Sequence, residues 1–355
     1  MNTYPLLQSQ LGIFLQCIQN PQSTQYNLPN AGFMPPTVDI ERLMDAWQRL
    51  MDARPEFRTR FMIDDNGDPR QWSDPEMQIP IVRRKMSEAE VQTYIHDGLV
   101  RPFDLLSGEP LFRIEFIETE KGWWQMTDGH HVVFDGMSFT PVIMQIDINK
   151  AYMGEELTPH PYGMYQAAED EVATFGTEVY EKAKAYYAEK FAGLDFATLS
   201  RSESGSMGKM ARCSTFINRQ LCDDWCKEHS VPINLLFQAA FSHILSVLLR
   251  QEKVAYFTVN HGRMDKRLRE CIGMFVKSVP ILANCTTDTT VTEFIKSFRT
   301  ELMSTIRYGV YPFNHFCRDL KMTSGVSFNF QALADMEEAM ILGRSASTAF
   351  SQCAI

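Results

Sequence analysis

The spacing of apolar residues predicts an amphipathic helix early in the chain. Apolar side chains recur at helical spacing directly after Asp39, which is a good capping residue: Ile40, Leu43, Met44, Trp47, Leu50 and Met51. One side of this helix is therefore apolar, and we expect it to pack on a sheet. Ser87 and Glu90 have the spacing of a capping box and predict a second helix that runs through Ile95.

Strand signals follow the first helix. A strand is expected through Phe57 and Phe61, and Asn66-Gly67 predicts a hairpin turn to the next strand. A tight hairpin turn needs positive φ at these positions, which asparagine and glycine tolerate. Both strands should belong to the same sheet.

A second pair of strands leads to a group of polar residues. Phe112, Ile114 and Phe116 alternate with polar residues, as in a half-buried strand. A turn at Lys121-Gly122 then starts a strand that ends at two adjacent histidines. A helix is expected over Pro141 to Ala151.

The second half of the chain mixes helices and strands in the same way. A helix is expected to begin near Thr174 and to carry the apolar residues Tyr180, Ala183, Tyr187 and Phe191. The Ser/Gly-rich stretch from Ser200 to Gly208 predicts a loop, and Ile233 to Leu249 predicts a long helix before a strand over Val254 to Asn260. Thr290 and Glu293 form another capping box. The predicted fold class is α/β, in the mixed α+β sense.

Length and charge narrow the possible functions. A chain of 355 residues with 45% hydrophobic residues can bury a large core and is long enough for about two domains. The net charge of −10 gives no reason to expect nucleic acid as a partner, because no face rich in Lys and Arg stands out. No stretch reaches the length of a signal peptide or a membrane span, so we expect no membrane partner and a cytoplasmic location.

The cysteines do not suggest a disulfide framework. There are eight, scattered without regular spacing, so we expect reduced and mostly buried thiols. Cys222 and Cys226 lie one helical turn apart with His229 just beyond. No second ligand pair follows at zinc-site spacing, so no metal site is predicted.

The residues with the clearest chemical potential are His130 and His131, followed by three apolar residues and then Asp135-Gly136. Because side chains alternate along a strand, one imidazole should face the core and the other can face a cavity. Asp135 can fold back to fix the turn, and Gly136 leaves its backbone amide unhindered. The pattern indicates an imidazole held in place for catalysis.

This run resembles the HHxxxDG signature of condensation domains in nonribosomal peptide synthetases, which are related to chloramphenicol acetyltransferase-like enzymes. Other segments are similar to family motifs in the same order, and the resemblance covers about residues 4 to 331. They are Tyr4 to Ile13, Arg54 to Phe61 (HPxLRTRF in the family), Arg101 to Asp104 (PFD), His261 to Arg263 with Ile272 to Val276 (GR…IGMFVN, with Lys277 where asparagine is usual), Tyr311 to Phe313, and Val326 to Gln331.

The resemblance implies a fold of two chloramphenicol acetyltransferase-like subdomains in a V-shaped arrangement with a central tunnel. We expect an N-terminal subdomain over residues 1–170, which carries the histidine motif, and a C-terminal subdomain over 171–355. Family domains normally continue for several tens of residues beyond the last motif, so the second subdomain looks shortened.

The resemblance also implies the reaction. A condensation domain forms an amide bond between a donor acyl or peptidyl thioester and an acceptor aminoacyl thioester, each on a peptidyl carrier protein. An adenylation domain is the expected neighbour. We expect no directly bound cofactor, since phosphopantetheine thioesters arrive on the carriers. His131 is the candidate catalytic ring. Either it takes the proton of the attacking amine, since the usual pKa of an imidazole suits proton transfer near neutrality, or it orients the amine and stabilises the tetrahedral intermediate. The Gly136 amide is the candidate oxyanion donor.

The resemblance assigns supporting roles to the other site residues. His130 and Asp135 should be structural, and Asp135 should pair with Arg58, with Arg263 as the second candidate. Ser138 either hydrogen-bonds a carrier-bound substrate or caps the following helix. Asp135→Ala should damage folding as well as rate, because it breaks a buried ion pair.

Related activities are partly excluded by missing residues. Heterocyclisation domains have a paired-aspartate signature in place of the histidines, and it is absent. Epimerisation domains carry a glutamate just before the HGR segment, where this chain has Val259 and Asn260. Two alternatives stay open: a stand-alone acyltransferase that uses coenzyme A or a carrier thioester, and an inactive platform that docks carrier proteins.

Overall fold

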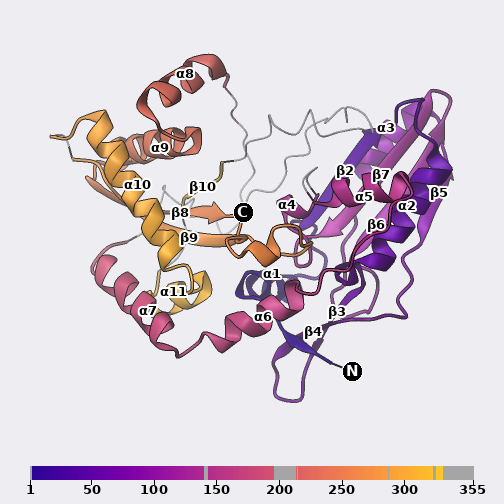
Figure 1. Cartoon of the computed structure of the whole chain (residues 1–355), viewed down its shortest axis with the longest axis horizontal. Coiled ribbons are helices and arrows are strands. Elements are labelled where there is room, and N and C mark those ends of the chain that lie inside the picture. Colours follow the sequence, from indigo (N-terminus) through magenta and orange to yellow (C-terminus); the bar gives the residue numbers. More distant parts are fainter. Residues whose placement is uncertain are drawn as a thin grey trace. The chain divides into compact units, whose positions relative to one another are not determined.

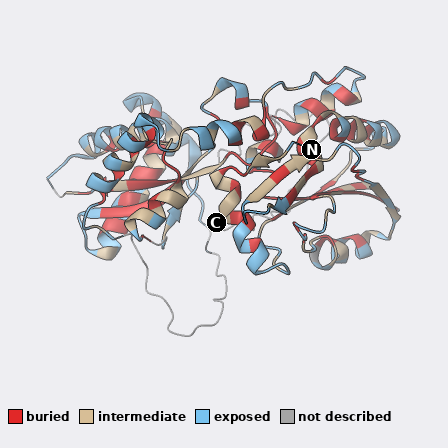
Figure 2. Ribbon diagram, turned by 90° about the horizontal axis from the view of Figure 1, so that it is seen from below, coloured by how far each residue is buried: buried red, intermediate tan, exposed pale blue. Residues whose placement is uncertain are grey.

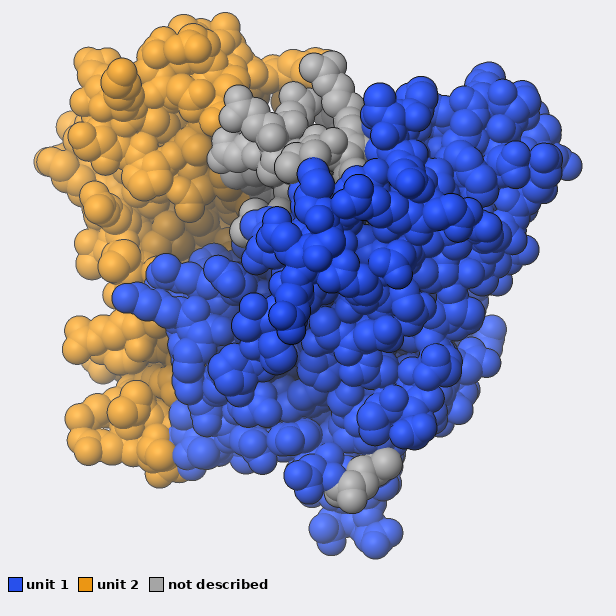
Figure 3. Space-filling model, turned by 45° about the vertical axis from the view of Figure 1, so that its right-hand side comes forward, with its two compact units in different colours: residues 1–175, 261–276, 332–355 blue, residues 176–260, 277–331 orange. Residues whose placement is uncertain are grey.

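The chain forms two compact units in the computed structural model, which describes residues 2–139, 143–195, 213, 215–286, 288–322 and 325–330. Of these described residues, unit 1 comprises those within 1–175 and 261–276, and unit 2 comprises those within 176–260 and 277–330 (Figure 3). The predicted boundary after residue 170 left residues 261–276 in the second subdomain. The structure instead packs this segment in unit 1, although both its ends join strands of unit 2.

Unit 1 is built around a four-stranded sheet (Figure 1). Its strands, in spatial order, are β2 (Asn27–Phe33), β7 (Gly122–His130), β6 (Phe112–Thr119) and β5 (Ile81–Lys85). All neighbours are antiparallel except β5 and β6. The predicted turn at Lys121-Gly122 is confirmed, and Gly122 supplies the positive φ of +140° that it requires.

Helices cover both faces of this sheet. On one face α2 (Ile40–Ala53) packs beside α5 (Met144–Tyr152), and the Trp47 ring stacks on Phe112 of β6. On the other face α3 (Glu88–Asp97) buries Val91 against Trp124 and Met126 of β7. The predicted cap at Asp39 and the capping box of Ser87 with Glu90 are both confirmed.

A smaller sheet of unit 1 contains β1 (Tyr4–Pro5), β4 (Pro69–Ser73) and β3 (Thr59–Ile63), in that order. The hairpin between β3 and β4 is confirmed, with Gly67 at a φ of +85°, but Asn66 keeps a negative φ. The strand predicted from Phe57 begins later, because Pro55 starts a short 3₁₀ helix, η1 (Pro55–Arg58). Proline favours the first position of a helix, since its missing N–H needs no partner there.

Unit 1 contains further helices besides those that cover the sheet. They are α1 (Gln8–Gln19), α4 (Gly136–Phe139), α6 (Met164–Ala173) and the short η2 (Lys266–Leu268). The helix predicted over Pro141 to Ala151 corresponds to α5, which begins at Met144; residues 140–142 lie outside the described residues.

Unit 2 contains a three-stranded sheet in the order β10 (Ser327–Phe328), β8 (Lys253–Asn260) and β9 (Lys277–Asn284). Its described residues also form α7 (Glu178–Lys190), α8 (Arg219–His229), α9 (Ile233–Leu249), α10 (Val291–Arg307) and α11 (Phe313–Leu320). The bounds of α9 and the capping box of α10 are as predicted. The predicted loop from Ser200 to Gly208 lies outside the described residues.

Buried residues concentrate on the strands and on the helix sides that face them in each unit (Figure 2). In unit 1 the main core continues from the sheet to Val132, Val133 and Phe134, so the loop after β7 is anchored by its own apolar residues. Within the described ranges, no single helix is long and apolar enough to cross a membrane. Among the described helices, α8 and α9 taken together have the length and apolar composition of a membrane span, but they are bent by 101° at their junction.

Candidate active site

The two histidines lie where β7 ends, as the strand pattern predicts. The backbone amide of His130 donates to Leu111 O, and that of His131 donates to Tyr26 O. Both side chains are buried, with 1% and 6% of their surface exposed. The strand end is thus held from two sides, and the loop that follows begins from a defined position.

Both ring nitrogens of His130 have partners within the protein. Its Nδ1 accepts a hydrogen bond from Val132 N at 3.1 Å, so the neutral ring carries its proton on Nε2, which lies 3.5 Å from Cys17 Sγ. Burial is the main cause that lowers the pKa of His130 to about 3; the neighbouring His131 ring, when it is protonated, and the Arg113 charge lower it further. His130 is therefore neutral and has no free nitrogen for a substrate.

His131 is in a different environment. Its Nδ1 is buried and makes no hydrogen bond of normal geometry among the described residues. Burial lowers the pKa of His131, while the Asp135 carboxylate and the carbonyls of His131 and Phe134 oppose this shift. At neutral pH the ring is uncharged, which is the form that can accept a proton from an amine.

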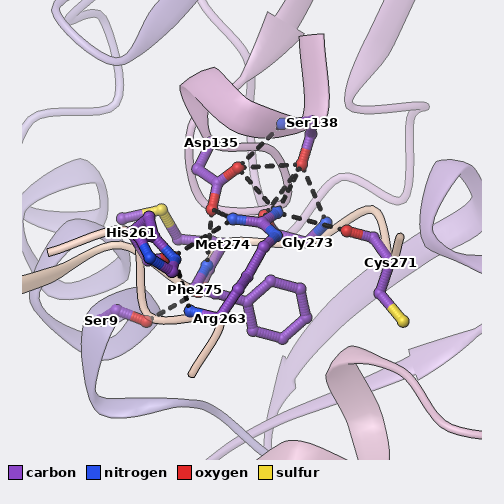
Figure 4. A network of polar contacts seen from close by, with 9 residues as sticks. All are labelled: Ser9, Asp135, Ser138, His261, Arg263, Cys271, Gly273, Met274 and Phe275. Atoms are coloured by element: carbon purple, nitrogen blue, oxygen red, sulfur yellow. Dashed lines mark hydrogen bonds and ion pairs between the residues drawn. The ribbon is translucent and has the colours of Figure 1, made fainter. Parts of the chain in front are cut away.

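The Asp135 carboxylate is saturated with hydrogen-bond donors (Figure 4). Oδ1 accepts from the Ser138 amide, the Ser138 hydroxyl and the Arg263 guanidinium, at 3.0, 3.0 and 2.9 Å. Oδ2 accepts from Arg263 at 2.6 Å and from Phe275 N at 3.0 Å. With five donors and no exposed surface, this carboxylate is suited to hold the turn rather than to transfer protons.

The prediction that Arg58 pairs with Asp135 is wrong. Arg263 makes that ion pair, with both guanidinium nitrogens on the carboxylate. Arg58 ends η1 and donates to Met51 O and Asp52 O at 2.6 and 3.1 Å. These carbonyls lie in the last turn of α2, where they lack helical partners and the helix dipole attracts a cation.

Segment 261–276 supplies most of the groups that hold the turn. Asp135 N donates to Gly273 O, and the ring of Phe275 lies under the Arg263 guanidinium, 4.7 Å from its carbon. Gly262 has a φ of +70°, and a Cβ there would lie 1.7 Å from Phe275 O. The close approach of the two ends of this segment therefore requires glycine at position 262.

Packing does not require glycine at position 136. A Cβ built on it meets no atom within 4 Å, and the residue is exposed at the start of α4. Gly136 thus lies at the surface, five residues after His131 on the same loop. This arrangement can bind a polar substrate group and stabilise a developing negative charge.

The sequence reasoning missed Gln10, although it lies in the quoted N-terminal motif. Its side chain is completely buried in α1 and donates to Val132 O and to the Gln71 amide oxygen, both at 2.9 Å. Val132 follows His131 directly, so the Gln10 hydrogen bond fixes the start of the histidine loop to α1. A glutamine among apolar helix residues was the available signal, because buried amides are costly unless hydrogen-bonded.

No group of three or more His, Cys, Asp or Glu side chains with metal-binding geometry occurs in the part of the chain that the structure describes. Cys222, Cys226 and His229 lie on α8 of unit 2. The His229 ring stacks on Trp225 at 4.1 Å, and its Nδ1 is 2.9 Å from Trp225 O. The polar groups of unit 1 described above are therefore the candidate active site.

The comparisons with known proteins agree on one family. A family model described as a condensation domain matches residues 1–352. Tyrocidine synthase 2 of Brevibacillus parabrevis is 25% identical over 335 residues, and surfactin synthase subunit 1 of Bacillus subtilis (strain 168) is 26% identical over 345 residues. These alignments cover 92% and 91% of this chain but only 9% of each synthase. The chain thus spans about a tenth of the length of these relatives.

The fold also matches solved structures. A variant of the starter condensation domain of rhizomide synthetase RzmA, in complex with C8-CoA, superimposes with a TM-score of 0.77 at 19% identity. The match covers 92% of this chain and 77% of the other. The mixed α/β fold expected from the sequence is therefore confirmed.

Proposed function

Because the chain belongs to the condensation-domain family, we propose that it joins two carrier-bound substrates through an amide bond. The donor is an acyl or peptidyl thioester, the acceptor is an aminoacyl thioester, and both are held on phosphopantetheine arms of carrier proteins. The observation that carries the proposal is a neutral, buried imidazole whose Nδ1 has no hydrogen-bond partner among the described residues, on a loop clamped by Asp135 and Arg263.

The residues suggest how the reaction proceeds. The acceptor amine attacks the thioester carbonyl, and His131 orients the amine and accepts its proton as the C–N bond forms. The carbonyl oxygen becomes negative, and the Gly136 amide is placed to donate a hydrogen bond to it. The C–S bond then breaks, and the donor thiol leaves with a proton. The products are the elongated acceptor thioester and a free carrier thiol.

Partners and location are part of the same proposal. We infer two peptidyl carrier proteins and a neighbouring adenylation domain, since the relatives are multidomain synthases. The cytoplasm is the proposed location. The described cysteines are all free thiols, which fits a reducing compartment.

A single-turnover assay tests the proposal. The chain is mixed with one carrier loaded with an acyl group and another loaded with an amino acid, and the condensed product is followed by mass spectrometry. We expect His131→Ala to lose about 10²- to 10⁴-fold in rate while it keeps its fold, as removal of a general base does. His229→Ala, an exposed imidazole of unit 2, is the matched control and should react normally.

The same assay separates the competing functions. Product with acyl-coenzyme A and a soluble amine, but not with carrier-bound acceptors, would identify a stand-alone acyltransferase. A folded chain that binds loaded carriers without forming product would identify a docking platform. Equal rates for His131→Ala and wild type would remove His131 from the mechanism.

A further inference from the structure

The hydroxyl of Ser138 belongs to the polar network beside the histidine loop (Figure 4). It is completely buried. Its Oγ lies 3.0 Å from Asp135 Oδ1, 3.0 Å from Gly273 O, 3.0 Å from Gly273 N, and 3.3 Å from an Arg263 nitrogen. Four polar neighbours from two separate segments thus surround one oxygen atom.

These contacts use the full capacity of a hydroxyl. A serine oxygen donates one hydrogen and accepts two. It accepts from the Gly273 amide and from Arg263, and its one hydrogen goes either to the Asp135 carboxylate or to Gly273 O. Nothing remains for a substrate, so the substrate-binding role considered for Ser138 from the sequence does not fit its surroundings.

The bonded groups show what the hydroxyl connects. Asp135 and Ser138 flank Gly136, whose amide is the proposed oxyanion donor. Gly273 lies in the segment that also accepts a hydrogen bond from Asp135 N and donates one from Phe275 N to the carboxylate. Ser138 is bonded to the carboxylate, to its arginine partner and to the backbone of the opposing segment at once. Its removal would loosen both sides of the turn.

We propose that Ser138 is a positioning residue that holds the Asp135-Gly136 turn against residues 271–275 and so keeps the Gly136 amide in register with His131. Its consequence for catalysis rests on the proposed function; its consequence for the loop does not. Without the hydroxyl, the buried Gly273 amide loses its bond to Ser138, and either the Asp135 carboxylate or Gly273 O loses a donor. The turn can then shift, and a shift of about 1 Å at a reacting group can cost 100-fold in rate.

Ser9 provides a matched control. Its hydroxyl, on α1, donates to Met274 O at 2.8 Å and therefore bonds the same segment from the other side. No contact joins it to Asp135 among the hydrogen bonds of the described residues. Ser9→Ala therefore removes a serine hydroxyl and a hydrogen bond to residues 271–275 but no hydrogen bond of the Asp135-Gly136 turn.

The test combines kinetics with hydrogen exchange. We expect Ser138→Ala to lower kcat about 10- to 100-fold at unchanged KM for both carriers, and Ser9→Ala to stay within about twofold of wild type in kcat, as a change outside the turn should. By exchange mass spectrometry, Ser138→Ala should speed exchange in peptides covering both 131–139 and 271–276. Ser9→Ala should affect only the second peptide.

Each contrary result is decisive. Unchanged exchange over 131–139 in Ser138→Ala would overturn the inference whatever the activity, as would a raised KM with normal kcat, which indicates substrate contact. If wild type forms no product, the proposed function fails, and the exchange comparison still decides the role of Ser138. If Ser138→Ala does not fold, Ser138→Thr keeps the hydroxyl. A normal exchange pattern over 131–139 in that variant supports the inference, and faster exchange there overturns it.

Discussion

Breaking the ion pair of Arg263 and Asp135 by removing the arginine should strongly destabilise unit 1. Arg263 is 3% exposed and Asp135 is fully buried, so Arg263→Met leaves a carboxylate inside the protein without its counter-ion. Removing one partner of a buried pair costs about 3–5 kcal/mol. Methionine keeps most of the side-chain volume, so the loss reflects charge and hydrogen bonding rather than a cavity.

Arg58→Met is the matched control, because Arg58 was the partner that the family motif suggested. Its guanidinium bonds the carbonyls of Met51 and Asp52 and is partly exposed. Water can replace part of these bonds, so we expect a loss of about 1–2 kcal/mol. The difference between the unfolding free energies of the two variants measures the cost of leaving the Asp135 charge buried without its partner.

Urea unfolding followed by tryptophan fluorescence is the appropriate assay. Trp47, Trp72, Trp123 and Trp124 lie in unit 1, and Trp225 lies in unit 2, so the signal reports mainly on unit 1. A double variant, Asp135→Asn with Arg263→Met, removes both charges. It should be more stable than Arg263→Met alone, since no uncompensated charge remains.

Two results would refute this reasoning. If Arg263→Met lowers the free energy of unfolding by no more than Arg58→Met does, the ion pair does not stabilise the loop. If the double variant is less stable than Arg263→Met by the full cost of Asp135→Asn, the two residues act independently, and the bidentate contact has no energetic role.

Two further predictions concern pH and backbone space. Burial, the largest cause, raises the pKa of Asp128 to about 7 despite Asn27 and Arg113 beside it, and burial raises that of Glu56 to about 7 as well. The folded state therefore holds protons that the unfolded chain has already released, so stability should fall by about 2.5 kcal/mol per group between pH 5 and pH 8. Urea titrations across this range should show the decline in unfolding free energy. Asp128→Asn and Glu56→Gln should each make the decline smaller. A wild-type stability that does not change with pH would contradict the raised pKa values. Because a Cβ at position 136 meets no other atom, Gly136→Ala should melt within about 2 °C of wild type, yet it should lose condensation activity. Gly262→Ala should fail to fold stably, because its Cβ would collide with Phe275 O. Calorimetry of both variants checks this, and similar melting temperatures would disprove it.

Local rules in the sequence were enough for most elements and for the chemistry of the motif. The period of Leu43, Trp47 and Leu50 determines which side of α2 is buried, because the geometry of a helix depends only on its own backbone. Capping residues such as Ser87 act within one turn, so they located helix ends directly. The alternation along β7 likewise implied that His130 and His131 have different surroundings.

The partners of the motif residues were decided by the tertiary structure. Arg58 and Arg263 were both candidates for Asp135. Asp135 and Arg263 are 128 residues apart in the sequence, and no local signal indicates their contact. The 3₁₀ turn begun by Pro55 directed Arg58 to the end of α2 and left the carboxylate to Arg263. Side-chain periodicity and capping operate over a few residues, whereas which distant charges meet depends on how whole segments pack. The sequence alone therefore specified the reactive loop, and only the folded chain specified what holds it.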